Sequence, residues 1–186
     1  MWDLQNPQPA KLIIGILAAN ETALAAAVKA ISKSFGVIDL TSDVWPFTQT
    51  DYYKDEIGPN ALRQFVSIEN LIDPGKLAQI KHDTNYLEQQ LAKKLGGVNP
   101  ALQLPRPVNL DPGFIEPSKL VLASTKNFSH RIYIGNKMFA EVTLIYEKGD
   151  WRHFVYTYPD YKEPHYQDFF TKVRTRLLEQ LKSDAK

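Results

Sequence analysis

The stretch Leu12-Ile13-Ile14-Gly15-Ile16-Leu17 decides the fold, because it is a continuous apolar run rich in β-branched residues. Such a run is typical of a central strand that is buried on both faces. The apolar run covers residues 12–19 and is too short to span a bilayer, which takes about 20 residues. The N-terminus lacks the basic and then apolar order of a signal peptide. We therefore expect a buried strand and no membrane association.

A helix and a second strand follow this first strand. Asn20 is a suitable N-cap for the helix, and Gly36 is a suitable stop. The apolar residues between them recur at helical spacing, at Leu24, Val28, Ile31 and Phe35. Residues 37–45 are then predicted to form a strand, so the chain opens with a β-α-β unit.

A second unit of similar kind follows after a loop over residues 46–62 that contains one helical turn. Residues 63–69 are predicted to form a third strand. Asp73-Pro74 offers a cap and a proline at the first helical position, and Gly96-Gly97 ends that helix. After a proline-rich loop, residues 108–110 form a fourth strand. This order of strands and helices favours a ferredoxin-like split β-α-β core.

The last third of the chain is predicted to extend this core with a three-stranded antiparallel meander and a terminal helix. Residues 131–134, 137–146 and 151–157 read as strands joined by tight turns at Gly135-Asn136 and Gly149-Asp150. The segment 118–124 is either a short helix or a strand. The terminal helix begins near Pro164, and its apolar stripe is Tyr166, Phe169, Phe170, Val173, Leu177 and Leu181. The predicted fold is a single α+β domain over residues 1–186.

Composition excludes several classes of function. The 22 basic and 21 acidic residues give a net charge of +1, which argues against broad binding to nucleic acid or to an anionic membrane. The core strands also lack the aromatic and basic pattern of RNA recognition motifs. Because the chain has no cysteine, disulfides and a thiol nucleophile are excluded. The lack of disulfides fits a cytoplasmic location.

The polar stretch from residue 109 to residue 161 is the predicted site. Glu141 lies on a strand face between apolar neighbours, and a buried carboxylate costs several kcal/mol unless it is paired. If Gly135-Asn136 is a two-residue loop, His130 lies directly across from Glu141. This pair is either a general base with its orienting carboxylate or a cross-strand ion pair. Asp160 completes the predicted catalytic set.

Further residues of this stretch are predicted to bind a small anionic ligand, such as a phosphate ester or a nucleotide. Lys126 and Arg131, with neighbouring hydroxyl groups, can hold a phosphate or a carboxylate; alternatively, they lie in a solvated turn. Asp111 either contributes a carboxylate at a strand end or caps a type II turn at Pro112-Gly113. The full predicted ligand-binding set is Asp111, Lys119, Lys126, Arg131 and Tyr161.

Metal binding is poorly supported, since the four histidines form no His-x-His or His-x-x-x-His pair. A site for a hard metal ion, formed by Asp111, Glu141 and Asp160, is an alternative that the sequence leaves open. No glycine-rich phosphate loop is present, and the sequence identifies no cofactor. An alternative function is a protein-interaction or oligomerisation module that uses exposed tyrosines at Tyr52-Tyr53 and over residues 156–161.

The sequence resembles the prokaryotic family called domain of unknown function 4416 over nearly its whole length. The resemblance rests on residues 11–17 and 47–58, on Val108-Asn109-Leu110-Asp111-Pro112-Gly113, on residues 124–135, on Ala140-Glu141-Val142-Thr143-Leu144 and on Thr157-Tyr158-Pro159-Asp160-Tyr161. The family is single-domain and functionally uncharacterised, so the resemblance implies no activity. Some members carry a GTP-binding label, which no loop of this sequence supports. The segment 96–106 is longer here than the usual family link.

Overall fold

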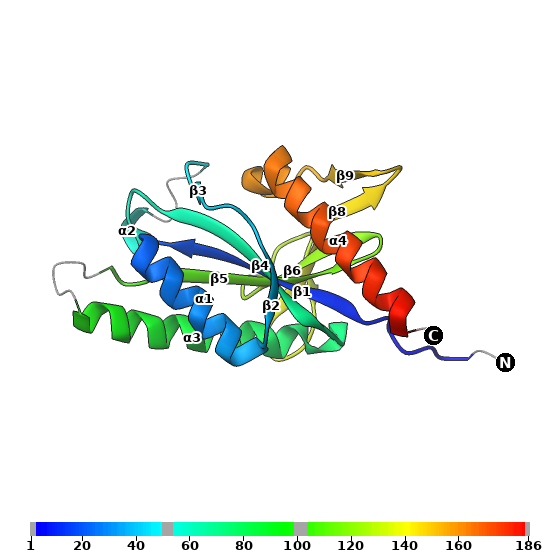
Figure 1. The fold of residues 1–186 in the computed structure, drawn as a ribbon, viewed down its shortest axis with the longest axis horizontal. Helices are drawn as coiled ribbons and strands as arrows, with labels where there is room; N and C mark the ends of the chain where they lie inside the picture. The colour runs from blue at the N-terminus through cyan, green and yellow to red at the C-terminus, as the bar shows by residue number, and fades with distance from the viewer. Residues whose placement is uncertain (1–2, 50–53, 99–103, 185–186) are drawn as a thin grey trace.

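The protein is a mixed α+β structure built on one large antiparallel sheet (Figure 1). The computed structural model describes residues 3–49, 54–98 and 104–184. Nine strands are found in this part of the chain, with the long path β2-β4-β1-β5-β6-β8-β7. The strands are β1 Ala10–Ala18, β2 Ile38–Thr41, β3 Trp45–Pro46, β4 Leu62–Ile72, β5 Val108–Glu116, β6 Lys119–Ser124, β7 Ile132–Tyr133, β8 Phe139–Glu147 and β9 Asp150–His153. The helices are α1 Glu21–Phe35, α2 Lys54–Ile57, α3 Leu77–Val98 and α4 Pro164–Asp184, with 3-10 turns η1 Pro74–Lys76 and η3 Pro159–Lys162.

Strand β1 lies at the centre of the sheet, as its sequence predicts. Every residue of β1 is buried, and the strand pairs with β4 on one edge and with β5 on the other. A Cβ atom on Gly15 would lie 3.0 Å from the Phe65 ring and 3.1 Å from Nη1 of Arg63. Gly15 therefore leaves room for these two side chains, which cross over the strand.

Helices α1 and α3 connect strands that are not neighbours. Helix α1 joins β1 to β2, and β4 lies between those strands; helix α3 joins β4 to β5, and β1 lies between those. The predicted caps are confirmed, since the Asn20 side chain accepts from the Ala23 N–H at 2.9 Å and Asp73 caps η1. Apolar residues of both helices pack on the same face of β1, in a cluster that includes Leu12, Ile14 and Ile16.

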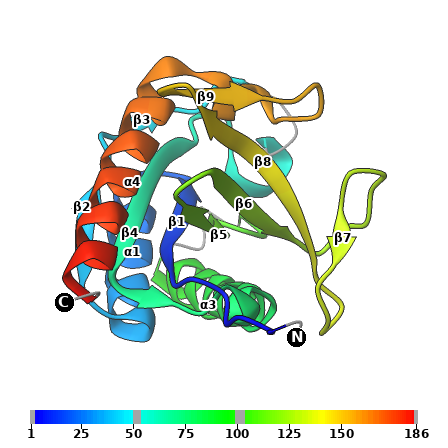
Figure 2. The same cartoon turned by 90° about the vertical axis from the view of Figure 1, so that its right-hand side faces the viewer.

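Helix α4 covers the opposite face with a largely aromatic cluster. Tyr166, Phe169, Phe170, Val173 and Leu177 are buried there, as the predicted stripe requires. They pack with Ile13 of β1, Phe65 of β4 and Trp151 of β9. Figure 2 shows α4 and α3 on different sides of β1. Within the described residues, no helix has both the length and the apolar character needed to cross a membrane.

The predicted turn at Pro112-Gly113 is wrong, because β5 continues through both residues to Glu116. Pro112 has no N–H to donate, and its nitrogen lies on the edge of β5 that faces β6. Pairing with β6 begins only at Gly113. No ladder hydrogen bond is therefore lost at Pro112. A Cβ atom on Gly113 would lie 2.3 Å from the carbonyl oxygen of Val121. The glycine therefore permits a close approach of two strands and does not mark a turn. Residues 118–124 were predicted as either a short helix or a strand, and the structure has strand β6 there.

The predicted meander is not confirmed. Ala140 of β8 pairs with Ala123 of β6 and with Ile132 of β7, so β6 and β7 lie on opposite edges of β8. Strand β9 also pairs along the edge opposite β6. The two short strands therefore share one edge of β8, and Figure 2 shows this part of the sheet extending away from β1. The last strand ends at His153, so residues 154–157 are not part of it.

Lys11 of β1 is fully buried and ties several elements together. Its Nζ donates to Asp39 of β2 at 2.5 Å, to the Glu69 carbonyl of β4 at 3.0 Å and to Gln180 of α4 at 2.8 Å. Burial opposes the charge of Lys11 and lowers its pKa, although Asp39 acts in the other direction. Burial also opposes ionisation of Asp39, but the hydrogen bonds from Lys11 and Ser67 outweigh it and lower the pKa of Asp39.

Candidate functional site

The polar residues of the predicted site form two neighbouring groups around β4, β5, β6 and β8 and the segment that follows β9. The first, called here the Glu141 group, consists of Ser124, His130, Arg131, Glu141 and Tyr158. The second, called here the Arg63 group, consists of Arg63, Asp111, Asp160, Tyr161 and Tyr166.

Glu141 is the centre of the first group. It is buried in β8, and its Oε2 accepts from Arg131 Nε at 2.7 Å and lies 3.0 Å from His130 Nε2. The Thr143 hydroxyl donates to the other carboxylate oxygen at 3.4 Å. The Arg131 charge compensates the buried carboxylate, which is what a charge at such depth requires.

Arg131 also fixes the segments around Glu141. Its Nη1 donates to the Ser124 hydroxyl at 2.8 Å and to the Lys126 carbonyl at 2.9 Å, and its Nη2 donates to the Tyr158 hydroxyl at 2.5 Å. Every nitrogen of the guanidinium group therefore has a partner already. Arg131 acts as a clamp between β6, β8 and the segment after β9, and it has little capacity left for a ligand.

His130 lies in a stack of aromatic rings. Its ring is 4.1 Å from the Tyr156 ring at an interplanar angle of 5°, and Tyr156 stacks on Phe154 at 5.0 Å. The Tyr156 hydroxyl donates to the Val142 carbonyl of β8 at 3.2 Å. Because Nε2 faces Glu141, Nδ1 is the ring nitrogen that can exchange a proton with another molecule. The imidazole side chain is 15% exposed.

The contact between His130 and Glu141 is predicted correctly, but the predicted register is wrong by one residue. Ile132 pairs with Ala140 and Tyr133 with Phe139, so continuation of the ladder places Arg131 across from Glu141. The turn is longer than two residues, with left-handed backbone at Gly135, Asn136 and Lys137. His130 precedes the strand and reaches the carboxylate from a turn closed by Arg131 N–H and the Phe128 carbonyl at 3.0 Å.

Arg63 is the centre of the second group and is only 3% exposed. Its Nη2 donates to Asp160 Oδ2 at 2.6 Å, and its Nη1 lies 3.6 Å from Asp111 Oδ2. The Cζ atom lies 5.2 to 5.9 Å from the centres of the Phe47, Phe65 and Tyr161 rings. Within the described residues, Nε and Nη1 of Arg63 and the buried hydroxyl of Tyr161 have no hydrogen-bond partner. The Tyr166 hydroxyl lies outside ideal hydrogen-bond geometry with Arg63 but close enough for the guanidinium to lower its pKa.

Burial controls the acid-base behaviour of this second group. It raises the pKa of Asp160, and the Arg63 guanidinium offsets only part of that effect. Burial also raises the pKa of Tyr166 to about 12 and that of Tyr161 well above its ordinary value. The same desolvation opposes the charge of Arg63, but Asp160 and the neighbouring groups outweigh it and raise the pKa of Arg63. Arg63 therefore stays a cation inside an apolar, aromatic shell.

Asp111 of β5 connects the Arg63 group to α3 and to solvent. Its side chain is 27% exposed, accepts from Asn109 Nδ2 at 2.7 Å and lies 3.9 Å from Lys81 Nζ. Lys81 donates to the Leu110 carbonyl at 2.8 Å, and Glu88 accepts from the Leu110 N–H at 2.7 Å. Two side chains of α3 thus satisfy the part of the β5 edge that β6 leaves unpaired.

Tyr158 lies close enough to both groups for their charges to change the pKa of its hydroxyl. Burial is the largest effect that raises the pKa of Tyr158, and both Glu141 and Asp111 raise it further, while Arg131 lowers it. The two groups are therefore neighbours in one electrostatic environment.

Comparison with known proteins gives one result. The family model described as "Domain of unknown function (DUF4416)" matches residues 8–177. The chain belongs to this family. No curated protein and no solved structure matches the chain significantly.

The matched DUF4416 region contains every residue of the two groups. Five of the residues that the sequence predicts for the site lie in them as polar neighbours: Asp111, His130, Arg131, Glu141 and Asp160. Tyr161 joins the Arg63 group, but its hydroxyl is buried in the α4 layer. Asp160 pairs with Arg63, whereas His130 and Glu141 pair with each other.

Two predicted ligand-binding lysines of the DUF4416 domain lie elsewhere. Lys119 forms an ion pair with Glu116 at the opposite end of β6 from Ser124, about 16 Å away along a strand. The side chain of Lys126 is exposed, and it is the backbone carbonyl of Lys126 that holds Arg131. Tyr52-Tyr53 lies outside the described residues.

Sequence reasoning missed Arg63, Lys81 and Tyr166. One signal was present for Arg63: it is a charged residue at the start of the apolar strand that continues through Phe65 and Val66. A charge in such a strand needs a buried partner. Among the described residues, no group of three or more histidine, aspartate or glutamate side chains is arranged to hold a metal ion.

Proposed function

We propose that this protein binds a small anionic ligand, such as a phosphate ester or a nucleotide, at the polar site built from residues 109–161 together with Arg63. One observation carries the proposal: the buried Arg63 cation has two nitrogens without a hydrogen-bond partner among the described residues. An unsatisfied buried donor costs about 1–3 kcal/mol, and more when the group is charged. The planar fork of arginine is suited to two oxygens of a phosphate or a carboxylate.

The neighbours of Arg63 support an anionic ligand. The Tyr161 hydroxyl is a further buried donor without a partner in the described part of the chain, and the Tyr166 hydroxyl lies beside Arg63. Their raised pKa values keep both hydroxyls protonated at neutral pH. Lys81 supplies a second, buried cation beside Asp111. Asp111 is the partly exposed member of the group and lies 3.6 Å from Nη1 of Arg63, so an anionic ligand reaches Nη1 by displacing this carboxylate.

His130 and Glu141 give the site a capacity for proton transfer. In this proposal His130 is the general acid or base, Glu141 orients its ring, and Arg131 holds the Glu141 carboxylate in place. In this proposal Asp160 does not donate a proton to the ligand. It holds the Arg63 guanidinium in place. The short distance between Glu141 and His130 Nε2, 3.0 Å, supports this assignment, because a catalytic histidine is commonly oriented through its second nitrogen.

A thermal-shift screen tests the proposal. The probes are inorganic phosphate, sugar phosphates and nucleoside mono- and triphosphates. A ligand at 100 times its Kd stabilises the folded state by about 2.7 kcal/mol, which raises the Tm of a chain of this size by about 5–10 °C. The variant of choice is Tyr166→Phe, which removes a buried hydroxyl that lies beside Arg63 outside ideal hydrogen-bond geometry. It should change the free energy of unfolding by no more than about 1 kcal/mol but weaken the ligand about tenfold.

Two controls make the result specific. Lys119→Ala removes a cation at the far end of β6 and should leave the shift unchanged. His130→Ala should keep the affinity and lose any turnover of the ligand. A screen without a shift for any of the probes, or an equal shift in Tyr166→Phe, would rule out an anion site at Arg63.

A second candidate function is a protein-interaction module, and the exposure of apolar side chains beside the site favours it. Phe128, Ile132, Tyr133, Val155 and Tyr158 are all exposed. Exposed apolar clusters of this kind often bind other proteins. The same screen separates the candidates, because Phe128→Ser should leave a ligand shift at Arg63 unchanged. The second candidate would be favoured if no probe raised the Tm and if a partner protein that binds the original chain failed to bind the Phe128→Ser variant.

We further infer that residues 1–186 form a single domain whose first part is a ferredoxin-like core. The strand order β2-β4-β1-β5, with two interleaved β-α-β connections, supports this assignment. The packing of α1 and α3 in one cluster on the same face also supports it.

A further inference from the structure

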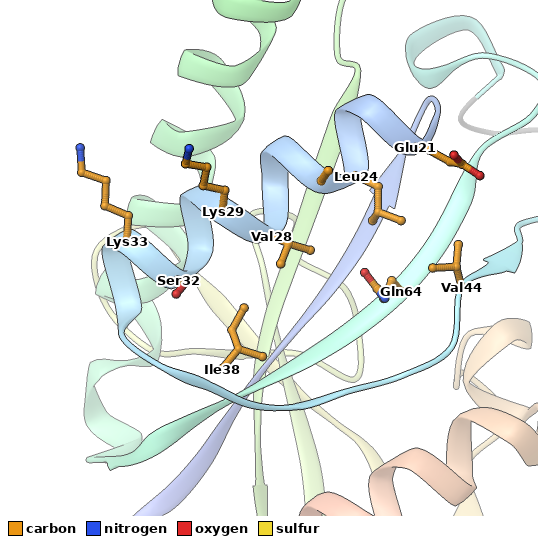
Figure 3. A pocket seen from close by; sticks show the side chains of 10 residues that line it. Glu21, Leu24, Val28, Lys29, Ser32, Lys33, Ile38, Val44 and Gln64 are labelled. Atoms are coloured by element: carbon orange, nitrogen blue, oxygen red, sulfur yellow. The ribbon is translucent and has the colours of Figure 1, made fainter.

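A groove unrelated to the site described above runs along α1, between this helix and the sheet edge at β2 (Figure 3). Its volume is about 790 Å³. Leu24, Ala25 and Val28 of α1 form its apolar wall, with Ile38 of β2 and Val44 opposite. Val44 is exposed. Such an apolar strip, bordered by charges, is typical of a surface that packs against another helix.

The charged residues of the groove are divided between its ends. Glu21 lies at the N-terminal end of α1, and Lys29 and Lys33 lie toward the C-terminal end (Figure 3). Ala25, a small and exposed residue, lies between them. An acidic first turn and a basic last turn match the partial charges of the helix ends. They also make this helix complementary to an antiparallel copy of itself.

We propose that the groove binds a second copy of this chain, with α1 of each copy lying in the groove of the other. A two-fold axis perpendicular to α1 makes the two α1 helices antiparallel. If the axis passes Ala25, Glu21 of one copy faces Lys29 of the other, and the same pair forms a second time by symmetry. If the axis passes at the level of residue 27, Glu21 of one copy faces Lys33 of the other. A parallel arrangement would instead place like charges side by side.

The position of β2 leaves room for the second helix. In the sheet order β2 is the outermost strand of its end of the sheet, and it pairs only with β4 among the described strands. On this face α1 and α3 pack over the inner strands, so the groove beside α1 is a place for a further helix. Ala25 allows a close approach of the two helix backbones, within the 8–10 Å that packed helices take. The contact would bury Val44, which the single chain exposes.

Charge reversal tests the proposal. Sedimentation velocity and light scattering should give a mass that rises with protein concentration from 21.2 kDa toward twice that value. Lys29→Glu with Lys33→Glu should weaken this self-association at least tenfold. Addition of Glu21→Lys to the same protein restores opposite charges across the axis, and the association should return to within about threefold of the original. Both effects follow from rim charges, which add modestly but select the partner.

A matched control is Lys93→Glu with Lys94→Glu, which makes the same change of net charge on exposed positions of α3. It should leave the association unchanged, and circular dichroism should show that all variants stay folded. Because the chain has no cysteine, Ala25→Cys also provides a unique site for a short bismaleimide cross-linker. Ala25→Cys should give a covalent dimer, and Lys94→Cys should not.

Three outcomes would overturn the proposal. The first is a monomer at every concentration. The second is a dimer that Lys29→Glu with Lys33→Glu does not weaken, which would place the contact on another face, such as the exposed tyrosines. The third is a stable complex whose mass is not a multiple of 21.2 kDa, since the groove would then take a different protein.

Discussion

Arg63 is a buried charge that depends on compensating interactions with the residues around it. Its guanidinium lies under three aromatic rings and has one close carboxylate, Asp160, which is 97 positions away in the sequence. Removing one partner of a buried pair leaves the other charge uncompensated, and the cost is larger than the net contribution of the intact pair. Arg63 and Asp160 are therefore expected to behave as a unit in stability measurements.

Arg63→Met should lower the free energy of unfolding by about 3–5 kcal/mol at pH 7, because it leaves Asp160 buried without its partner. The loss should be smaller at pH 4.5. A buried carboxyl whose folded-state pKa is raised holds its proton to a higher pH than in the unfolded chain, so stability falls as the pH rises through that window. Urea denaturation at the two pH values measures both effects. The double variant Arg63→Met with Asp160→Asn should recover part of the loss, and an equal loss at both pH values would contradict this account.

The sequence predicted the pair His130–Glu141 but not the pair Arg63–Asp160, and the reason is sequence separation. His130 and Glu141 lie on either side of one turn and only 11 positions apart, so the short connection keeps them close, and His130 reaches the carboxylate from the turn before β7 although the predicted register is wrong by one. Arg63 meets Asp160 only because β4 and η3 are packed together by the α4 layer. Local patterns carry no information about such a contact.

At the scale of the element, the pair β5–β6 shows how a turn signal can mislead. Pro112-Gly113 has the composition of a turn, but the strand continues because β1 pairs with both residues along one edge. The glycine is needed for another reason, since β6 crosses so closely that the Val121 carbonyl occupies the place of a Cβ atom. Element types were predictable here from periodicity, while the function of this glycine depends on a neighbouring strand.

Gly113→Ala should therefore lower the free energy of unfolding by about 3 kcal/mol, at the upper end of the usual cost of overpacking. The contact is with backbone, at 2.3 Å, so a side-chain rotation cannot relieve it. Gly96→Ala is the matched control, because nothing lies within 4 Å of a Cβ atom at that helical position. It should raise stability by about 0.5–1 kcal/mol. Chemical denaturation measures both, and a loss below 1 kcal/mol for Gly113→Ala would mean that β5 and β6 can separate without cost.

At the scale of the whole molecule, β1 is shared by both layers of the structure. Its residues alternate between the α1 and α3 layer and the α4 layer, and Lys11 joins β1, β2, β4 and α4 through one ammonium group. The sequence predicted the buried strand and the helices α1, α3 and α4, because an apolar run and helical stripes are local signals. It did not predict the path of β7 and β9 along one edge of β8, since that depends on which edge β6 already occupies.

Because both layers depend on β1, the protein should unfold in one cooperative step. Trp45 and Trp151 pack in the α4 layer, so their fluorescence reports that layer, while far-ultraviolet circular dichroism also reports α1 and α3. In a Trp2→Phe background the two signals should give the same urea midpoint and slope, which is the test of two-state behaviour. Lys11→Met should lower the midpoint of both signals together, because it leaves Asp39 without its closest partner. If fluorescence instead changed at lower urea than the dichroism signal, α4 and its aromatic cluster would be a separate unit, and the assignment of residues 1–186 to a single domain would fail.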